Sequence, residues 1–144
     1  MRENNIQDIR AFNRFYTDLI GLLNQHLLDS SYSLAEARII YEVYKGKSIK
    51  ASQIMETMQI DKSYLSRLIK KLEKDGIIIK KQSEQDARAI QISLSQKGLK
   101  EFDRLNKASD NQITELLKPL TNEESEQLSF HMKAIVHLLK ANDR

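Results

Sequence analysis

The sequence predicts a mostly α-helical fold that carries a small antiparallel β-wing, and three observations support this. Apolar residues recur every three or four positions over most of the 144 residues, the spacing that gives a helix one apolar face. Residues 90–94 instead alternate apolar and polar side chains, as a strand does. One proline and four scattered glycines form no flexible linker. With 40% apolar residues, we expect a single core and one domain over residues 1–144.

The first expected element is an amphipathic helix over residues 1–29. Gly21 falls inside it, where glycine ordinarily costs helix stability. We interpret this glycine as a kink that lets the helix cross a partner helix at an angle, as a dimer-forming helix can. The apolar stripe consists of Ile6, Ile9, Phe12, Leu19, Leu22 and Leu27.

A second helix is expected from Leu34 to Lys45, and a third, from Tyr64 to Asp75, has two contrasting faces. The apolar face consists of Leu65, Leu68, Ile69 and Leu72. The opposite face carries four cations, Arg67, Lys70, Lys71 and Lys74. Because the net charge of the whole chain is only +3, positive charge is concentrated on this helix. Such a face suits a negatively charged surface, and a nucleic acid backbone is the favoured one.

A charged loop and a short strand are expected next. The loop holds Lys80, Lys81, Glu84 and Arg88, and the strand is Ile90–Leu94. Glu84 and Asp86 could act as acids in an enzyme. They lie among cations in a short loop, however, which favours a charge-balancing role, and we expect no enzymatic activity.

The run from Leu99 to Leu139 is expected to be helical, with Gly98 just before it and Pro119 interrupting it. Two helix starts are expected within it. Ser109 with Gln112 has the pattern of a capping box, and Ala108 with Ile113 that of a hydrophobic staple. Thr121 with Glu124 repeats the capping pattern. Two such helices could pair with those of a second copy.

Several classes of site are disfavoured by composition. The chain has no cysteine, which excludes disulfides and thiolate metal sites and fits a cytoplasmic protein. His131 and His137 lie six residues apart rather than four, so a surface role is favoured over metal binding. We identify no cofactor. Neither a signal peptide nor a membrane span is expected, and no membrane partner.

The order of a basic helix, a charged loop and a strand resembles that of the MarR family of bacterial transcriptional regulators, over essentially the whole chain. The resemblance implies a winged helix-turn-helix fold, built as a homodimer that meets a palindromic operator. It implies a recognition helix in the major groove and a charged wing loop against the adjoining backbone. A small-molecule allosteric ligand is also compatible with the resemblance, although no residue specifies one.

Together with the charge and apolar patterns, the resemblance suggests three sets of candidate residues. The recognition-helix set is Tyr64, Arg67, Lys70, Lys71 and Lys74, and the wing-loop set is Lys80, Lys81 and Arg88. The candidate dimer interface is Ile6, Ile9, Phe12, Leu19, Leu22, Leu128, Ile135 and Val136. One alternative stays open: a structural or interaction module whose basic helix contacts an acidic protein surface rather than DNA.

Overall fold

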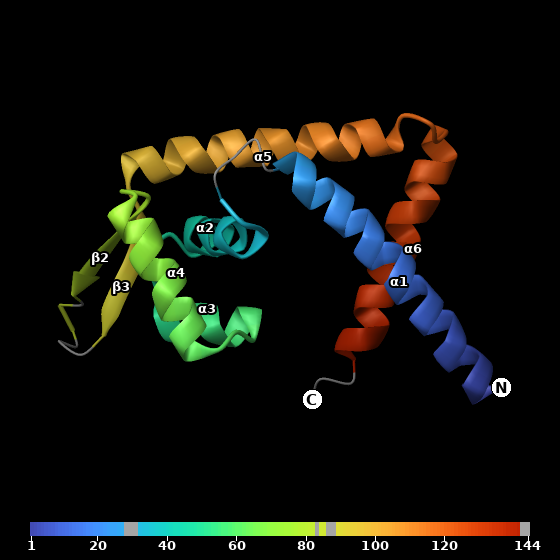
Figure 1. Ribbon diagram of the computed structural model, residues 1–144, viewed down its shortest axis with the longest axis horizontal. Helices are drawn as coiled ribbons and strands as arrows, with labels where there is room; N and C mark the ends of the chain where they lie inside the picture. Colours follow the sequence, from blue (N-terminus) through green and yellow to red (C-terminus); the bar gives the residue numbers. More distant parts are fainter. Residues whose placement is uncertain (28–31, 83, 86–88, 142–144) are drawn as a thin grey trace. The chain divides into compact units, whose positions relative to one another are not determined.

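The computed structural model describes residues 1–27, 32–82, 84–85 and 89–141 (Figure 1). The chain divides into two compact units, Met1–Ser109 and Asp110–Arg144. Six helices and three short strands occur in the described residues. None of the described helices combines the length and apolar character needed to cross a bilayer.

Helix α1 spans Arg2–Leu27, and residues 28 and 29 of the expected helix lie outside the described part of the chain. The helix continues through Gly21. Apart from the neighbouring backbone of α1 itself, no atom lies within 4 Å of the position that a Cβ would take at Gly21, so close packing against the described residues does not explain the glycine. The rings of Phe12 and Tyr16 stack with centroids 5.5 Å apart, one helical turn from each other.

Helices α2 (Leu34–Gly46), α3 (Ala51–Met58) and α4 (Lys62–Lys74) follow, with the two-residue strand β1 (Ile49–Lys50) before α3. The expected helices at 34–45 and 64–75 are confirmed as α2 and α4. A capping box begins α2, because the Ser33 side chain accepts from the Glu36 amide while the Glu36 carboxylate accepts from the Ser33 amide, each at 3.2 Å.

The sheet contains β1, β2 (Ile78–Gln82) and β3 (Ile90–Leu94) in the order β1-β3-β2, with both pairs antiparallel. Figure 1 shows β2 and β3 lying side by side next to α4. Their register runs from Ile78 opposite Leu94 to Gln82 opposite Ile90. The predicted strand at 90–94 is therefore confirmed. We call β2, β3 and the connecting residues 83–89 the wing.

The placement of Lys80 and Lys81 in a loop is wrong, because both lie in β2 and pair with Ile92 and Gln91. The three isoleucines at 77–79 favour an extended backbone, and the ladder to β3 carries it on through the lysines. Arg88, the third residue of the predicted set, lies outside the described residues.

The core lies within the first unit and is built from α2, α3, α4, the sheet and the beginning of α5. Its fully buried members include Ile39, Ile54, Leu72 and Ile92. Leu65 and Ile69 of the predicted apolar face of α4 are also buried, and Leu68 packs against them partly exposed. Burial of this face leaves the opposite side of α4 to solvent.

Helix α5 spans Gln96–Leu117, so it begins before Gly98 rather than after it. Ser95 Oγ accepts from the Gly98 amide at 3.0 Å, and the Ser95 carbonyl accepts from the Leu99 amide. A Cβ at Gly98 would collide with the carbonyl oxygen of Ile77. The glycine is therefore needed because α5 lies close to Ile77, the residue before β2. It does not mark the helix boundary that the sequence predicts.

Helix α6 spans Asn122–Lys140 and begins as predicted, with a capping box between Thr121 and Glu124. The predicted helix start at Ser109 is wrong, because Ser109 lies in the interior of α5. The S-x-x-Q pattern alone does not start a helix where the preceding residues are already helical.

Candidate nucleic-acid interface

Helices α3 and α4 form a helix-turn-helix with a three-residue turn, Gln59–Asp61. Gln59 adopts the left-handed conformation at φ 50°, and its amide bonds to the Met55 carbonyl. Asp61 Oδ2 then accepts from the Tyr64 amide at 3.1 Å and begins α4. Ile54 of α3 is fully buried, which holds the first helix against the core.

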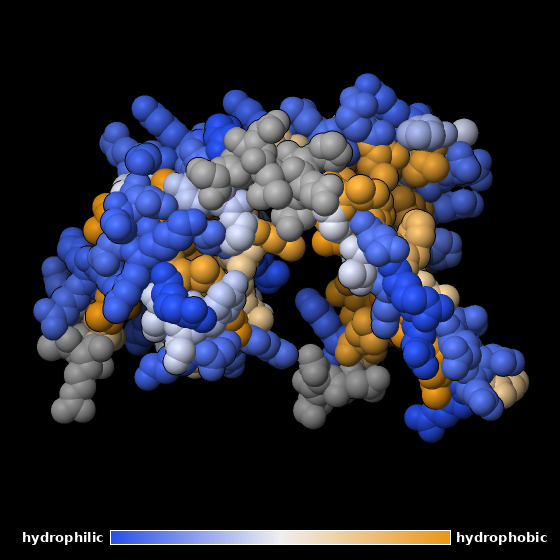
Figure 2. All heavy atoms as spheres, viewed as in Figure 1, coloured by the Kyte–Doolittle hydropathy of each residue, from blue (hydrophilic) through white to orange (hydrophobic). Residues whose placement is uncertain are grey.

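The exposed face of α4 carries Tyr64, Arg67, Lys70, Lys71 and Lys74, as the sequence predicted. Hydrophilic residues cover this region of the surface in Figure 2. The Arg67 guanidinium lies 5.5 Å from the centroid of the Tyr64 ring, a cation–π contact along one turn of the helix. Tyr64 thereby limits the directions in which Arg67 can extend.

Lys71 differs from the other cations of this face because it has a buried partner. Its Nζ donates to Glu36 Oε2 of α2 at 2.7 Å and lies 5.7 Å from the centroid of the Tyr32 ring. The Glu36 side chain is only 6% exposed, whereas that of Lys71 is 48% exposed. The pair thus connects α4 to the N-terminus of α2.

The same contact governs the pKa of both groups. Burial acts to raise the pKa of Glu36, but hydrogen bonds from Lys71 and Ser33 outweigh it, so the pKa lies below its usual value. The hydrogen bond to Glu36 raises the pKa of Lys71. Both groups are therefore charged at neutral pH.

The C-terminal end of α4 is held by residues at the beginning of α5. Lys97 Nζ donates to the Asp75 carbonyl at 2.7 Å, and the Ser95 hydroxyl donates to the carbonyls of Gly76 and Ile77. Gly76 adopts a positive φ of 77°. These contacts give partners to the carbonyls of the three residues that follow the last turn of α4, and they fix the turn between α4 and β2.

The two lysines of β2 point to opposite faces of the sheet, because successive side chains alternate along a strand. Lys80 shares the face of buried Ile78, and its Nζ lies 3.5 Å from Glu73 of α4. Lys81 is exposed on the other face. The structure therefore brings Lys80 beside α4 and leaves Lys81 apart from it.

The first two turns of α4 present further polar groups that the sequence did not single out. Lys62, Ser63 and Ser66 are exposed, and they lie toward the helix N-terminus, where recognition helices contact bases. The capping residue Asp61 marks the start of the helix and could have revealed them.

Helices α1 and α6 each expose a row of apolar side chains in the single chain. On α1, Ile6, Ile9, Phe12 and Leu22 are 44–59% exposed. On α6, Ile135 and Val136 are 39% and 50% exposed, and Phe130, Leu138 and Leu139 exceed 65%. Leu19 and Leu128 are partly exposed. His131 and His137 are exposed on α6 as well.

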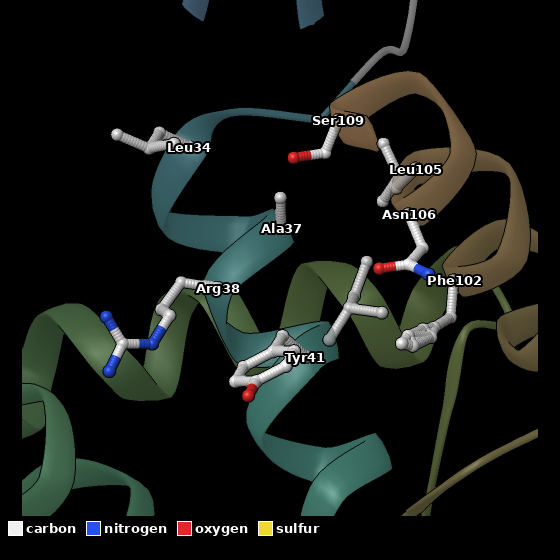
Figure 3. Close-up of a pocket in the computed structure, with 9 residues that line it drawn as sticks. Leu34, Ala37, Arg38, Tyr41, Phe102, Leu105, Asn106 and Ser109 are labelled. Carbon is white, nitrogen blue, oxygen red and sulfur yellow. The ribbon is translucent and has the colours of Figure 1, made fainter. Parts of the chain in front are cut away.

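A pocket of about 230 Å³ lies between α2 and the first half of α5 (Figure 3). Leu34, Ala37, Phe102 and Leu105 contribute apolar walls. The side chains of Asn106 and Ser109 point toward α2, whereas Arg38 points away in Figure 3 and pairs with Glu42 at 3.0 Å. The pocket is smaller than the roughly 300–1,000 Å³ of typical small-molecule sites.

Comparison with known proteins decides the family. The model of the MarR family matches residues 32–90, which include α2, α3, α4 and β2. The HTH-type transcriptional regulator PrsX of Escherichia coli is 30% identical over 133 residues, covering 90% of this chain and 78% of PrsX. The chain belongs to the MarR family.

Solved structures of the MarR family share this fold. Wild-type MarR of Escherichia coli in its apo form superposes with a TM-score of 0.79 at 19% identity, covering 88% of this chain and 93% of MarR. A mutant MarR of Escherichia coli complexed with operator DNA matches with a TM-score of 0.73 at 19% identity, covering 88% and 91%. The winged-helix fold predicted from the sequence is thereby confirmed.

Proposed function

We propose that this protein is a transcriptional regulator that binds a palindromic operator as a homodimer, and not an enzyme. The observation that carries the proposal is the exposed cationic face of α4, which the helix-turn-helix presents while the core buries its opposite face. A helix presented in this way can enter the major groove, where side chains distinguish base pairs. A cytoplasmic location belongs to the same proposal.

Direct contacts are assigned to three residues of α4. Arg67, oriented by Tyr64, suits bidentate contact with a guanine edge, and Lys70 and Lys74 suit phosphates. Lys80, Lys81 and Arg88 of the wing are assigned to the adjoining backbone. Lys71, the remaining member of the predicted set, is set apart by its pairing with Glu36.

The homodimer is supported by the apolar rows of α1 and α6. Soluble monomers rarely expose contiguous apolar surface of this kind, and a second copy of the chain would cover it. A dimer presents two copies of α4, which accounts for a palindromic site. We assign both compact units to one functional domain over residues 1–144.

Selection of duplexes from a random-sequence library by the purified protein tests this function. We expect an enriched palindrome whose half-sites lie about 10 bp apart, or a multiple of that spacing. Affinity for the enriched duplex should fall steeply with salt concentration. Absence of an enriched sequence would contradict the proposal, and binding to an acidic protein surface would become the favoured function.

A further inference from the structure

We propose that Lys71 is a positioning residue, which fixes the recognition helix on α2 through Glu36 instead of contacting operator phosphate. The inference rests on the proposed DNA-binding function and deepens it. It divides the cationic face of α4 into residues that touch DNA and one residue that orients the others.

The Lys71 ammonium lies close to two buried side chains. Its Nζ is 2.7 Å from Glu36 Oε2 and 5.7 Å from the ring centroid of Tyr32. Glu36 and Tyr32 are both buried, at 5% and 8% exposure. In contrast, no hydrogen bond or ion pair to another described residue is made by the side chain of Lys70 or of Lys74. The two lysines without such contacts remain available to an external anion.

Glu36, the partner of Lys71, is itself held in place by another contact. Glu36 Oε1 accepts from the Ser33 amide, so the capping box that begins α2 fixes this carboxylate before Lys71 reaches it. Lys71 is thus bound to the helix start of α2 rather than to a mobile side chain. Displacing Lys71 toward a phosphate would leave a buried carboxylate without its cation, which is costly.

A second contact, from α5, also holds α4. Lys97 of α5 holds the carbonyl of Asp75 just beyond the last turn of α4. Lys71 and Lys97 together tie the C-terminal half of α4 to two different helices, α2 and α5. The exposed face of the N-terminal half, with Tyr64 and Arg67, is then held in a fixed orientation.

Four single variants distinguish a lysine that positions α4 from a lysine that contacts phosphate. The variants are Lys71→Met, Lys71→Arg, Glu36→Gln and, as the matched control, Lys70→Met. A glutamine at position 36 can still complete the capping box, so α2 should fold. Affinity is measured against the duplex enriched by the unsubstituted protein, at several salt concentrations.

Lys71→Met and Glu36→Gln should each lower the affinity about tenfold, the size of one charged hydrogen bond, and leave the salt dependence unchanged. A protein that carries both Lys71→Met and Glu36→Gln should bind no worse than either single variant, and Lys71→Arg should bind about as well as the unsubstituted protein. Lys70→Met should lower both the affinity and the slope of log K against log salt, by about 0.9. If Glu36→Gln instead leaves affinity unchanged or raises it, Lys71 contacts phosphate and the inference is wrong.

Amide hydrogen exchange without DNA tests the positioning independently of the proposed function. Exchange in α4 should accelerate in Lys71→Met and Glu36→Gln but not in Lys70→Met. If this occurs in a protein that enriches no duplex, the proposed function fails while the attachment of α4 stands. Unchanged exchange in both variants would overturn the inference whatever the protein binds.

Discussion

The helices of the winged-helix core and helices α1 and α6 are all amphipathic, yet they treat their apolar faces differently. In the core, Ile39, Ile54 and Leu72 have no exposed surface. On α1 and α6, Phe15, Phe130 and Leu138 are each about two-thirds exposed. The core is therefore buried within one chain, whereas the apolar rows of α1 and α6 need a second surface to bury them.

The largest expected effect is on the apolar rows. Val136→Glu places a charge on the row of α6 and should shift the protein to monomers. A monomer offers one recognition helix instead of two, so affinity for a palindromic duplex should fall by about 10²–10⁴-fold. Light scattering after size-exclusion chromatography, at two protein concentrations, measures the assembly.

Gln127→Glu is the matched control, because Gln127 is an exposed polar residue of α6 on the side opposite to Val136. It should leave both assembly and affinity unchanged. A dimer that persists in Val136→Glu would show that α6 does not lie in the interface. The contrast between α6 and the core helices would then not hold.

A substitution in the core should lower stability by the same amount at every protein concentration. Leu72→Ala removes a fully buried side chain and should lower the free energy of unfolding by roughly 2–5 kcal/mol. Urea titration should give this loss at every protein concentration. The corresponding Leu139→Ala change on α6 should cost stability in a manner that depends on concentration, since a second copy supplies its burial. Equal, concentration-independent costs would contradict the distinction.

Acid should weaken the attachment of α4 to α2. The folded protein holds the pKa of Glu36 below its usual 4.5, so the carboxylate stabilises the fold above that pH and loses this effect as pH falls. Glu36→Gln should cost about 1.5 kcal/mol at neutral pH. Thermal unfolding at several pH values should show this cost shrinking below about pH 4.5. A cost independent of pH would mean that the charge of Glu36 contributes nothing.

The smallest expected effect compares two helix-start patterns. Thr121→Ala removes the cap of α6 and should cost about 1 kcal/mol in urea unfolding. Ser109→Ala, at the predicted start that lies inside α5, should cost nothing or add slight stability, because alanine favours helix interiors. A comparable loss at Ser109 would imply a helix boundary there.

These two serine and threonine positions show what local sequence could and could not predict. The pattern at Thr121 follows Pro119, which ends the preceding helix, so the local signal and the structure agree. At Ser109 the pattern lies on a helix that had already begun at Gln96. Ser95 caps that earlier start by accepting from the Gly98 amide, while Gly98 itself is required by the close approach to the carbonyl of Ile77, a contact between segments that spacing cannot reveal.

The candidate site divides in the same way. The periodicity of Leu65, Ile69 and Leu72 was sufficient to predict which face of α4 is exposed, because burial follows helical spacing. The strand position of Lys80 and Lys81 depends on pairing with β3 and was missed. Helix α3 was also missed, although Ala51, Ile54, Met55 and Met58 recur at helical spacing and pack in the core, because this pattern spans only eight residues. The pairing of Lys71 with Glu36 joins residues 35 positions apart and has no local signal.

The central claim is that the outward face of α4 recognises specific bases, and Arg67→Ala tests it most directly. Fluorescence anisotropy would compare binding of this variant and the unsubstituted protein to the enriched palindrome and to a scrambled duplex of equal length. We predict that Arg67→Ala loses about 1–3 kcal/mol of discrimination between the two duplexes while it keeps its fold by circular dichroism. A folded Arg67→Ala protein that discriminates as well as the unsubstituted one would contradict the claim.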